Sequence, residues 1–232
     1  MQICGLQKLS LLDYPDKLAA TVFFGGCNFR CPFCHNAALV TDTSGTPRIP
    51  EGEVVAFLER RRNFLDGVCV TGGEPLLQPE LPDFLARVRA MGYRIKLDTN
   101  GFSPDGLRAL IDRGLVDYVA MDVKNSLEKY PQTVGLLQVD LDAIRASARL
   151  IMEGRVDYEF RTTLVREFHQ MADIRSIGEW LHGAGKYFLQ KFEDSGRLIQ
   201  SGLHAVDDET ARQMRILAQA YFDTVGLRGM EK

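Results

Sequence analysis

The sequence predicts an α/β fold, a partial and open (β/α)6 barrel of the TIM-like kind. After residue 50, short apolar segments alternate with segments that carry apolar residues at helical spacing. Strands that alternate with helices indicate βαβ units and a parallel sheet. About six strands can be counted from Ala19 onward, and the chain has 232 residues, fewer than the roughly 250 of a complete eightfold barrel. The alternation, the strand count and the length together favour an incomplete barrel.

The expected strands share one pattern, a short run of apolar and β-branched residues that ends at turn-forming residues. The first strand is followed by Gly25-Gly26, and the third is stopped by Asn100-Gly101. The six strands are expected at 20–24, 68–70, 94–97, 118–123, 158–165 and 187–192.

The intervening helices are predicted from apolar residues three and four positions apart. The segment 81–91 shows this spacing, and Ser103-Pro104 supplies an N-cap and a first-turn residue for the helix that follows. No repeat or linker divides the chain, so we expect a single domain over 1–232 with an N-terminal extension at 1–18. Further helices are expected over 141–151, 174–181 and, at the C-terminal end, 208–225.

Composition and charge exclude several classes of partner. Hydrophobic residues make up 45% and charged residues 25% of the chain, which is ordinary for a globular protein. The formal net charge of −3 gives no basic field to attract nucleic acid. No apolar run reaches the roughly 18–20 residues of a membrane helix, and charged side chains interrupt any signal-peptide core near the N-terminus. We therefore expect a cytoplasmic protein without a nucleic-acid or membrane partner.

Three cysteines close together form the strongest motif. Cys27, Cys31 and Cys34 follow the first strand and its Gly-Gly turn, and loops after the strands of a parallel α/β fold carry its chemistry. In a reducing compartment such clustered thiols indicate metal ligands. Iron–sulfur clusters are held by thiolates, normally four for a [4Fe–4S] cube. Three thiolates on one loop therefore predict a cube whose fourth iron is open to a substrate or cofactor.

Zinc is the alternative metal at this loop. His35 directly follows Cys34, so a site of three cysteines and one histidine is chemically possible. Zinc sites usually pair their ligands across two separated segments, and a ligand adjacent to Cys34 is geometrically awkward. The iron–sulfur interpretation is favoured, and a zinc-binding module without catalysis stays open as a further hypothesis. Of the other cysteines, Cys69 is expected to be a buried structural thiol.

The cysteine spacing, three residues and then two with an aromatic before the last, resembles the radical S-adenosylmethionine (SAM) superfamily. In that family the open iron binds SAM, and an electron from the cluster cleaves it to methionine and a 5′-deoxyadenosyl radical. The resemblance implies a partial barrel of the radical SAM type, one [4Fe–4S] cluster and SAM. Gly72-Gly73-Glu74-Pro75 matches a second segment of the family, which packs against the SAM amino group.

Two later strand ends, 96–101 and 121–124, resemble the glycyl-radical-enzyme activases. In that group both strand ends face SAM, and aspartates at the positions of Asp98 and Asp122 help hold a monovalent cation. An Asx-type turn with Asn100-Gly101 is the structural alternative for Asp98. The resemblance implies SAM contacts at Gly72, Gly73, Glu74, Asp98, Thr99, Asn100, Asp122, Lys124 and Arg161. Weaker candidates for the site are Gln190, Lys191, His35 and Asn36.

Residues 1–229 as a whole resemble proteins described as anaerobic ribonucleoside-triphosphate reductase activating proteins. One departure is Asp16, where glycine is expected, which puts the conformation of that turn in question. The resemblance implies an enzyme that abstracts a hydrogen from a glycine of a partner glycyl radical enzyme, the anaerobic ribonucleotide reductase. It also implies flavodoxin or ferredoxin as the electron donor. A radical SAM enzyme that acts on a small molecule stays open as the alternative.

Overall fold

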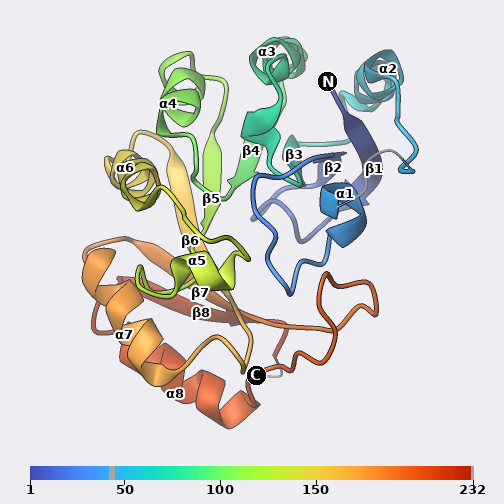
Figure 1. The fold of residues 1–232 in the computed structure, drawn as a ribbon. Helices are drawn as coiled ribbons and strands as arrows, with labels where there is room; N and C mark the ends of the chain where they lie inside the picture. The colour runs from blue at the N-terminus through green and yellow to red at the C-terminus, as the bar shows by residue number, and fades with distance from the viewer. Residues whose placement is uncertain (42–44, 231–232) are drawn as a thin grey trace.

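The computed structural model describes residues 1–41 and 45–230, which form one eight-stranded sheet with the strands in chain order, β1 to β8 (Figure 1). β1 pairs with β2 antiparallel, and every pair from β2 to β8 is parallel. The strands are β1 (Ile3–Ser10), β2 (Ala19–Phe24), β3 (Gly67–Gly72), β4 (Arg94–Thr99), β5 (Tyr118–Asp122), β6 (Asp157–Leu164), β7 (Lys186–Lys191) and β8 (Thr224–Arg228). The six expected strands correspond to β2–β7, so the predicted partial α/β barrel is confirmed.

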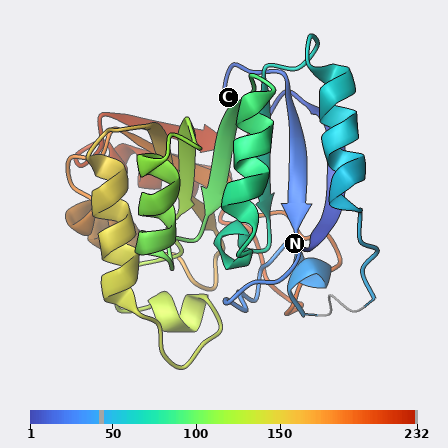
Figure 2. The same cartoon turned by 90° about the horizontal axis from the view of Figure 1, so that it is seen from above.

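Helices cover the outer face of the curved sheet, where α2, α3, α4 and α6 stand side by side (Figure 2). They bury the apolar residues whose spacing predicts them, such as Leu107, Leu110 and Ile111 in α4. The helices are α1 (Ala37–Thr41), α2 (Glu51–Arg61), α3 (Leu81–Ala90), α4 (Pro104–Asp112), α5 (Tyr130–Thr133), α6 (Leu141–Met152), α7 (Met171–Trp180) and α8 (Asp208–Ala218). None of the helices in the described part of the chain is long and apolar enough to span a membrane.

The C-terminal segment differs from the prediction. The helix expected over 208–225 ends at Ala218, and the residues beyond it return to the sheet as β8, parallel to β7. The ring of Phe222 stacks on the ring of Tyr187 in β7, with 4.4 Å between the ring centroids. This contact holds the chain against the sheet after α8 ends. Because it joins residues that are far apart in the sequence, the spacing of apolar residues within 208–225 could not predict it.

A buried carboxylate anchors the new strand. Glu159 in β6 is 1% exposed, and its two oxygens each accept a hydrogen bond of 2.7 Å from the Arg228 guanidinium. The Tyr118 hydroxyl donates a further bond of 2.8 Å to Glu159. Burial raises the pKa of Glu159, but the bonds from Arg228 hold it below its ordinary value. Hydrogen bonds to Glu159 therefore connect β5, β6 and β8.

The first 18 residues belong to the sheet and the base of the barrel, so the expected extension is in fact structural. After β1 the chain lies beside the N-terminal ends of the parallel strands, where Tyr14 packs against Tyr118 at 5.9 Å. Asp16 has a φ of 57°, in the left-handed region that favours glycine. The turn therefore keeps the backbone conformation of the expected glycine, and the aspartate tolerates it.

Candidate functional site

The residues implicated by the sequence gather around one cavity of about 390 Å³. The cavity lies at the C-terminal ends of the parallel strands, where barrel folds place their sites. Among the weaker candidates, His35, Asn36 and Gln190 also line it, whereas Lys191 does not and bonds Asp208 at 2.9 Å. The expected residues that line it are Cys27, Cys31, Cys34, Gly72, Gly73, Glu74, Asp98, Thr99, Asn100, Asp122, Lys124 and Arg161. Lining residues missed by the sequence analysis are Asp13, Phe29, Phe33, Val40, Thr71 and Thr163.

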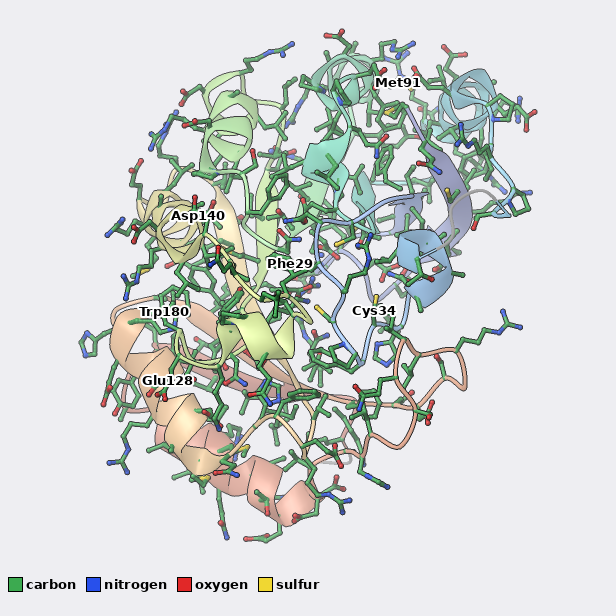
Figure 3. All side chains as sticks on the ribbon, in the orientation of Figure 1. Phe29, Cys34, Met91, Glu128, Asp140 and Trp180 are labelled. Carbon is green, nitrogen blue, oxygen red and sulfur yellow. The ribbon has the colours of Figure 1, made fainter. Side chains whose placement is uncertain are left out.

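The cysteine loop, residues 25–36, is held by backbone hydrogen bonds to distant segments. Arg30 N donates to the Val134 carbonyl at 2.8 Å, and Gln200 N donates to the Pro32 carbonyl at 3.0 Å. Phe29 packs edge-on against the Tyr130 ring of α5 at 6.4 Å, and both Phe29 and Cys34 are marked in Figure 3. The aromatic residues between the cysteines thus bind the loop to the rest of the barrel.

The three thiols have the chemistry of a cluster site. Burial raises the pKa of all three, that of Cys31 to about 12, so these thiols hold their protons until a metal displaces them. All three line the same cavity, and a cube places each thiolate on a separate iron. Three thiols from one loop are therefore a donor set that fits a cluster.

His35, the fourth ligand of the zinc alternative, is bound elsewhere. Its Nε2 lies 2.6 Å from the Glu193 carbonyl oxygen, and its ring stacks on Phe192 at 5.7 Å. The neighbouring Asn36 instead donates a hydrogen bond of 2.8 Å to the Gly72 carbonyl. These contacts connect the end of the cysteine loop to β3 and to the segment after β7.

The Gly72-Gly73 turn after β3 lies directly against the cysteine loop. Glu74 N donates a hydrogen bond of 2.8 Å to the Gly26 carbonyl. Gly72 has a φ of 112°, and a Cβ on Gly73 would lie 1.9 Å from the Gly26 oxygen. Only residues without a side chain allow this approach, so the glycines join the ends of β2 and β3.

Glu74 is directed into the protein. Its side chain is 1% exposed, and its carboxylate accepts hydrogen bonds from Leu76 N (3.1 Å), Thr99 Oγ1 (2.9 Å) and Asn100 N (2.7 Å). The carboxylate therefore fixes the Gly-Gly turn to the end of β4. Burial raises its pKa to about 7 in spite of these three donors.

This raised pKa predicts a pH-dependent stability. Between an ordinary pKa near 4.5 and the folded value near 7, the folded chain keeps a proton that the unfolded chain releases. The contribution of Glu74 to stability is therefore largest below pH 4.5 and is lost as the pH rises toward 7. Anaerobic urea unfolding should show the wild type losing about 2–3 kcal/mol relative to Glu74→Gln across this range. If the free energy of unfolding changed with pH in the same way in both proteins, the raised pKa of Glu74 would be contradicted.

Five charged side chains meet across β4, β5 and β6. The Arg161 guanidinium lies between two aspartates, 3.4 Å from Asp98 Oδ2 and 3.0 Å from Asp122 Oδ1. The other Asp122 oxygen is 3.1 Å from Lys124 Nζ, and the other Asp98 oxygen bonds Lys96 Nζ. Burial raises the aspartate pKa values, but these cations outweigh it, so Asp98 falls below its ordinary pKa and Asp122 to about 2. Both aspartates are therefore ionised at neutral pH.

Asn100 joins the end of β4 to the cysteine loop. Its Nδ2 donates to Asn28 Oδ1 at 2.8 Å and lies 3.8 Å from Cys27 Sγ. Its Oδ1 accepts from Phe102 N at 3.0 Å. The Asx-type turn considered for Asp98 is therefore made by Asn100, which leaves Asp98 to the charged group.

Comparison with known proteins agrees with this geometry. The family model described as the radical SAM superfamily matches residues 21–174. The fold is also that of a radical SAM methyltransferase from Sphaerobacter thermophilus, with a TM-score of 0.71 and 17% identity over 92% of this chain and 67% of that one.

Curated relatives cover the chain to different extents. A Methanocaldococcus jannaschii protein, described provisionally as a glycyl-radical enzyme activating enzyme, is 31% identical over 97% of this chain and 95% of its own length. The pyruvate formate-lyase-activating enzyme of Clostridium pasteurianum is 31% identical over 53% of this chain and 52% of its own. A 7-carboxy-7-deazaguanine synthase of Methanopyrus kandleri is 38% identical over 45% and 48%, respectively. The chain therefore belongs to the radical SAM superfamily, resembles its glycyl-radical activating branch over nearly its whole length, and is an enzyme that uses a [4Fe–4S] cluster and SAM.

Proposed function

We propose that this enzyme generates a radical on a glycine of a partner glycyl radical enzyme, the anaerobic ribonucleotide reductase. The observation that carries the proposal is the cavity itself, where the cysteine loop, the Gly-Gly turn and the charged group meet at one end of the barrel. Similarity to a relative described as an activating enzyme, over 97% of the chain, supports the choice of branch.

In this proposal Cys27, Cys31 and Cys34 would hold the [4Fe–4S] cluster, with flavodoxin or ferredoxin as the electron donor. The cluster would supply the electron for the cleavage of SAM to methionine and the 5′-deoxyadenosyl radical. Phe29 and Phe33 are buried beside the cysteines, and their rings exclude water from the inner side of the cluster loop. Because a water-poor site strengthens electrostatic interactions, the nearby charges act strongly on a bound ligand.

SAM is proposed to lie across the strand ends, and the charges there suit its polar groups. Three basic side chains surround two ionised aspartates, so the group carries an excess positive charge that attracts a carboxylate. Arg161 and Lys124 are placed to bind the SAM carboxylate. The SAM amino group would bind backbone carbonyls of the Gly72-Gly73 turn, since the Glu74 carboxylate is occupied by protein donors.

The open sheet offers a reason for a protein substrate. β1 and β8 are its edges and do not pair with each other, so the barrel is not closed around a small ligand. The target glycine must come within van der Waals reach of the SAM 5′ carbon, since hydrogen abstraction needs near-attack geometry. The glycine loop of the partner must leave its own core to reach this point.

The decisive experiment is anaerobic incubation with the ribonucleotide reductase, SAM and a reductant, followed by electron paramagnetic resonance. We expect a doublet from a glycine-centred radical. The doublet should disappear when that glycine of the reductase is changed to alanine, and also when Cys31→Ala replaces the wild-type activating enzyme. SAM cleavage at full rate without a radical on any glycyl radical enzyme of the same cell would contradict the proposal.

A small-molecule substrate is the second candidate, favoured by the similarity of about half the chain to 7-carboxy-7-deazaguanine synthases. This candidate predicts 5′-deoxyadenosine formation that depends on a metabolite and proceeds without any partner protein. Measuring deoxyadenosine with the reductase, with a metabolite fraction and with neither separates the two candidates directly.

A further inference from the structure

The two aspartates at the strand ends have no oxygen without a basic partner in the protein. On Asp98, Oδ1 bonds Lys96 and Oδ2 faces Arg161 at 3.4 Å. On Asp122, Oδ1 faces Arg161 at 3.0 Å and Oδ2 faces Lys124 at 3.1 Å. Each carboxylate oxygen is thus paired with a fixed positive charge from β4, from β6 or from the residues that follow β5.

This arrangement does not fit the monovalent cation that the resemblance implies. Carboxylate oxygens attract a cation through their negative charge, and here three basic groups already contact the two carboxylates. Beside Asp98, where the side chains of Lys96 and Arg161 are 2% and 12% exposed, an added ion would meet both positive charges with little screening by solvent. The oxygens at this position therefore favour protein cations over sodium or potassium.

Lys96 begins the 96–101 segment, but it is the member of the charged group to which the sequence assigned no role in the site. It lies two residues before Asp98 on β4, so both side chains point to the same face of the strand, into the barrel. Its side chain is 2% exposed, and its Nζ contacts Cys69 Sγ at 3.8 Å besides the Asp98 carboxylate. The buried Lys96 ammonium is therefore a positive charge, supplied by the protein, that is paired with the Asp98 carboxylate.

We propose that the Lys96 ammonium takes the place of the monovalent cation beside Asp98, so that this enzyme binds SAM without sodium or potassium. The inference rests on the proposed placement of SAM at these strand ends. Lys96 keeps Asp98 neutralised and oriented through Oδ1, so Asp98 still has a cation partner if Arg161 also contacts the SAM carboxylate. Lys96 is thus a positioning residue, since it acts on SAM through Asp98.

The test compares the affinity of cluster-loaded protein for SAM in potassium, sodium and choline chloride at equal ionic strength. The wild type should show the same dissociation constant in all three salts within about twofold. Lys96→Met keeps a long unbranched side chain but removes its charge, which leaves Asp98 short of a cation. This variant should need potassium or sodium, with affinity falling by roughly tenfold or more in choline. Sodium NMR should show line broadening with Lys96→Met and none with the wild type.

Arg94→Met is the matched control. Arg94 lies on the same strand, but its side chain is 63% exposed and pairs with Asp117 outside the cavity, so this variant should behave as the wild type does. If the wild type bound SAM more weakly in choline chloride than in the other salts, the proposal would be overturned. This measurement uses the wild type alone, so it does not depend on whether a variant folds. A Lys96→Met protein that binds SAM equally well in every salt would also overturn it. Neither measurement includes the partner enzyme, so a failed glycyl-radical assay would leave this result intact.

Discussion

Alanine at Cys27, Cys31 or Cys34 should each remove most of the iron from the protein, from about four atoms per chain to less than one. Each thiolate holds a different iron of the cube, so no neighbour can replace a lost ligand. Cys31 is buried, as are Phe29 and Phe33 on the same loop, so water cannot readily take its place. Iron and sulfide analysis after anaerobic reconstitution, with absorbance near 400 nm, measures the loss.

Cys4→Ala and Cys69→Ala are the matched controls and should retain the cluster. Cys69 is fully buried in β3 beside Lys96 and does not line the cavity that contains the other three. Stoichiometric zinc in the isolated protein, together with failure to assemble any iron, would establish the zinc alternative in place of the cluster.

The sequence was most informative where chemistry and periodicity are local. Short sequence segments were enough to identify the cysteine motif, the Gly-Gly turn and the strand ends at Asp98 and Asp122. The structure brings these segments together at one cavity. Their convergence follows from the parallel sheet, because the carboxyl ends of parallel strands meet at the same edge. A correct fold class was therefore sufficient to gather residues that are far apart in the chain.

Long-range contacts account for what the sequence analysis missed. β8 depends on Arg228 reaching Glu159, and on Phe222 stacking on Tyr187, and neither partner is visible from the segment itself. The same holds for the role of Lys96: the segment 96–101 was singled out from the sequence, but the pairing of Lys96 with Asp98 is visible only in the folded chain. Pair interactions between strands have no sequence period, so composition and spacing cannot reveal them.

Glu74 shows how a correct motif can still leave a role unassigned. The resemblance of its motif to the family segment placed Glu74 at the SAM site, and the residue does line the cavity. Its carboxylate, however, accepts hydrogen bonds from protein donors in η1 (Pro75–Leu77), at the end of β4 and directly after it. Which face of a side chain meets the ligand depends on hydrogen-bond partners that only the folded chain supplies.

Gly73→Ala should be the most damaging single substitution at the Gly-Gly turn. The new Cβ would lie 1.9 Å from the Gly26 carbonyl oxygen, well inside van der Waals contact, and both groups are fixed by the backbone. Because no flexible side chain can move aside, the turn must separate from the cysteine loop and break the bond from Glu74 N to Gly26. We expect a loss of about 3 kcal/mol or more in the free energy of unfolding.

The matched control is Gly52→Ala in α2, where an added Cβ meets no atom within 4 Å. Alanine favours a helix over glycine, so this variant should lie between no change and a gain of about 1 kcal/mol. Anaerobic urea unfolding measures both variants, and SAM binding by the cluster-loaded proteins reports on the site. A Gly73→Ala protein as stable as the wild type, with unchanged SAM affinity, would show that the two loops do not need this contact. The expected result is loss of both properties, because the same backbone contact that closes the fold at this point also places the turn beside the cluster.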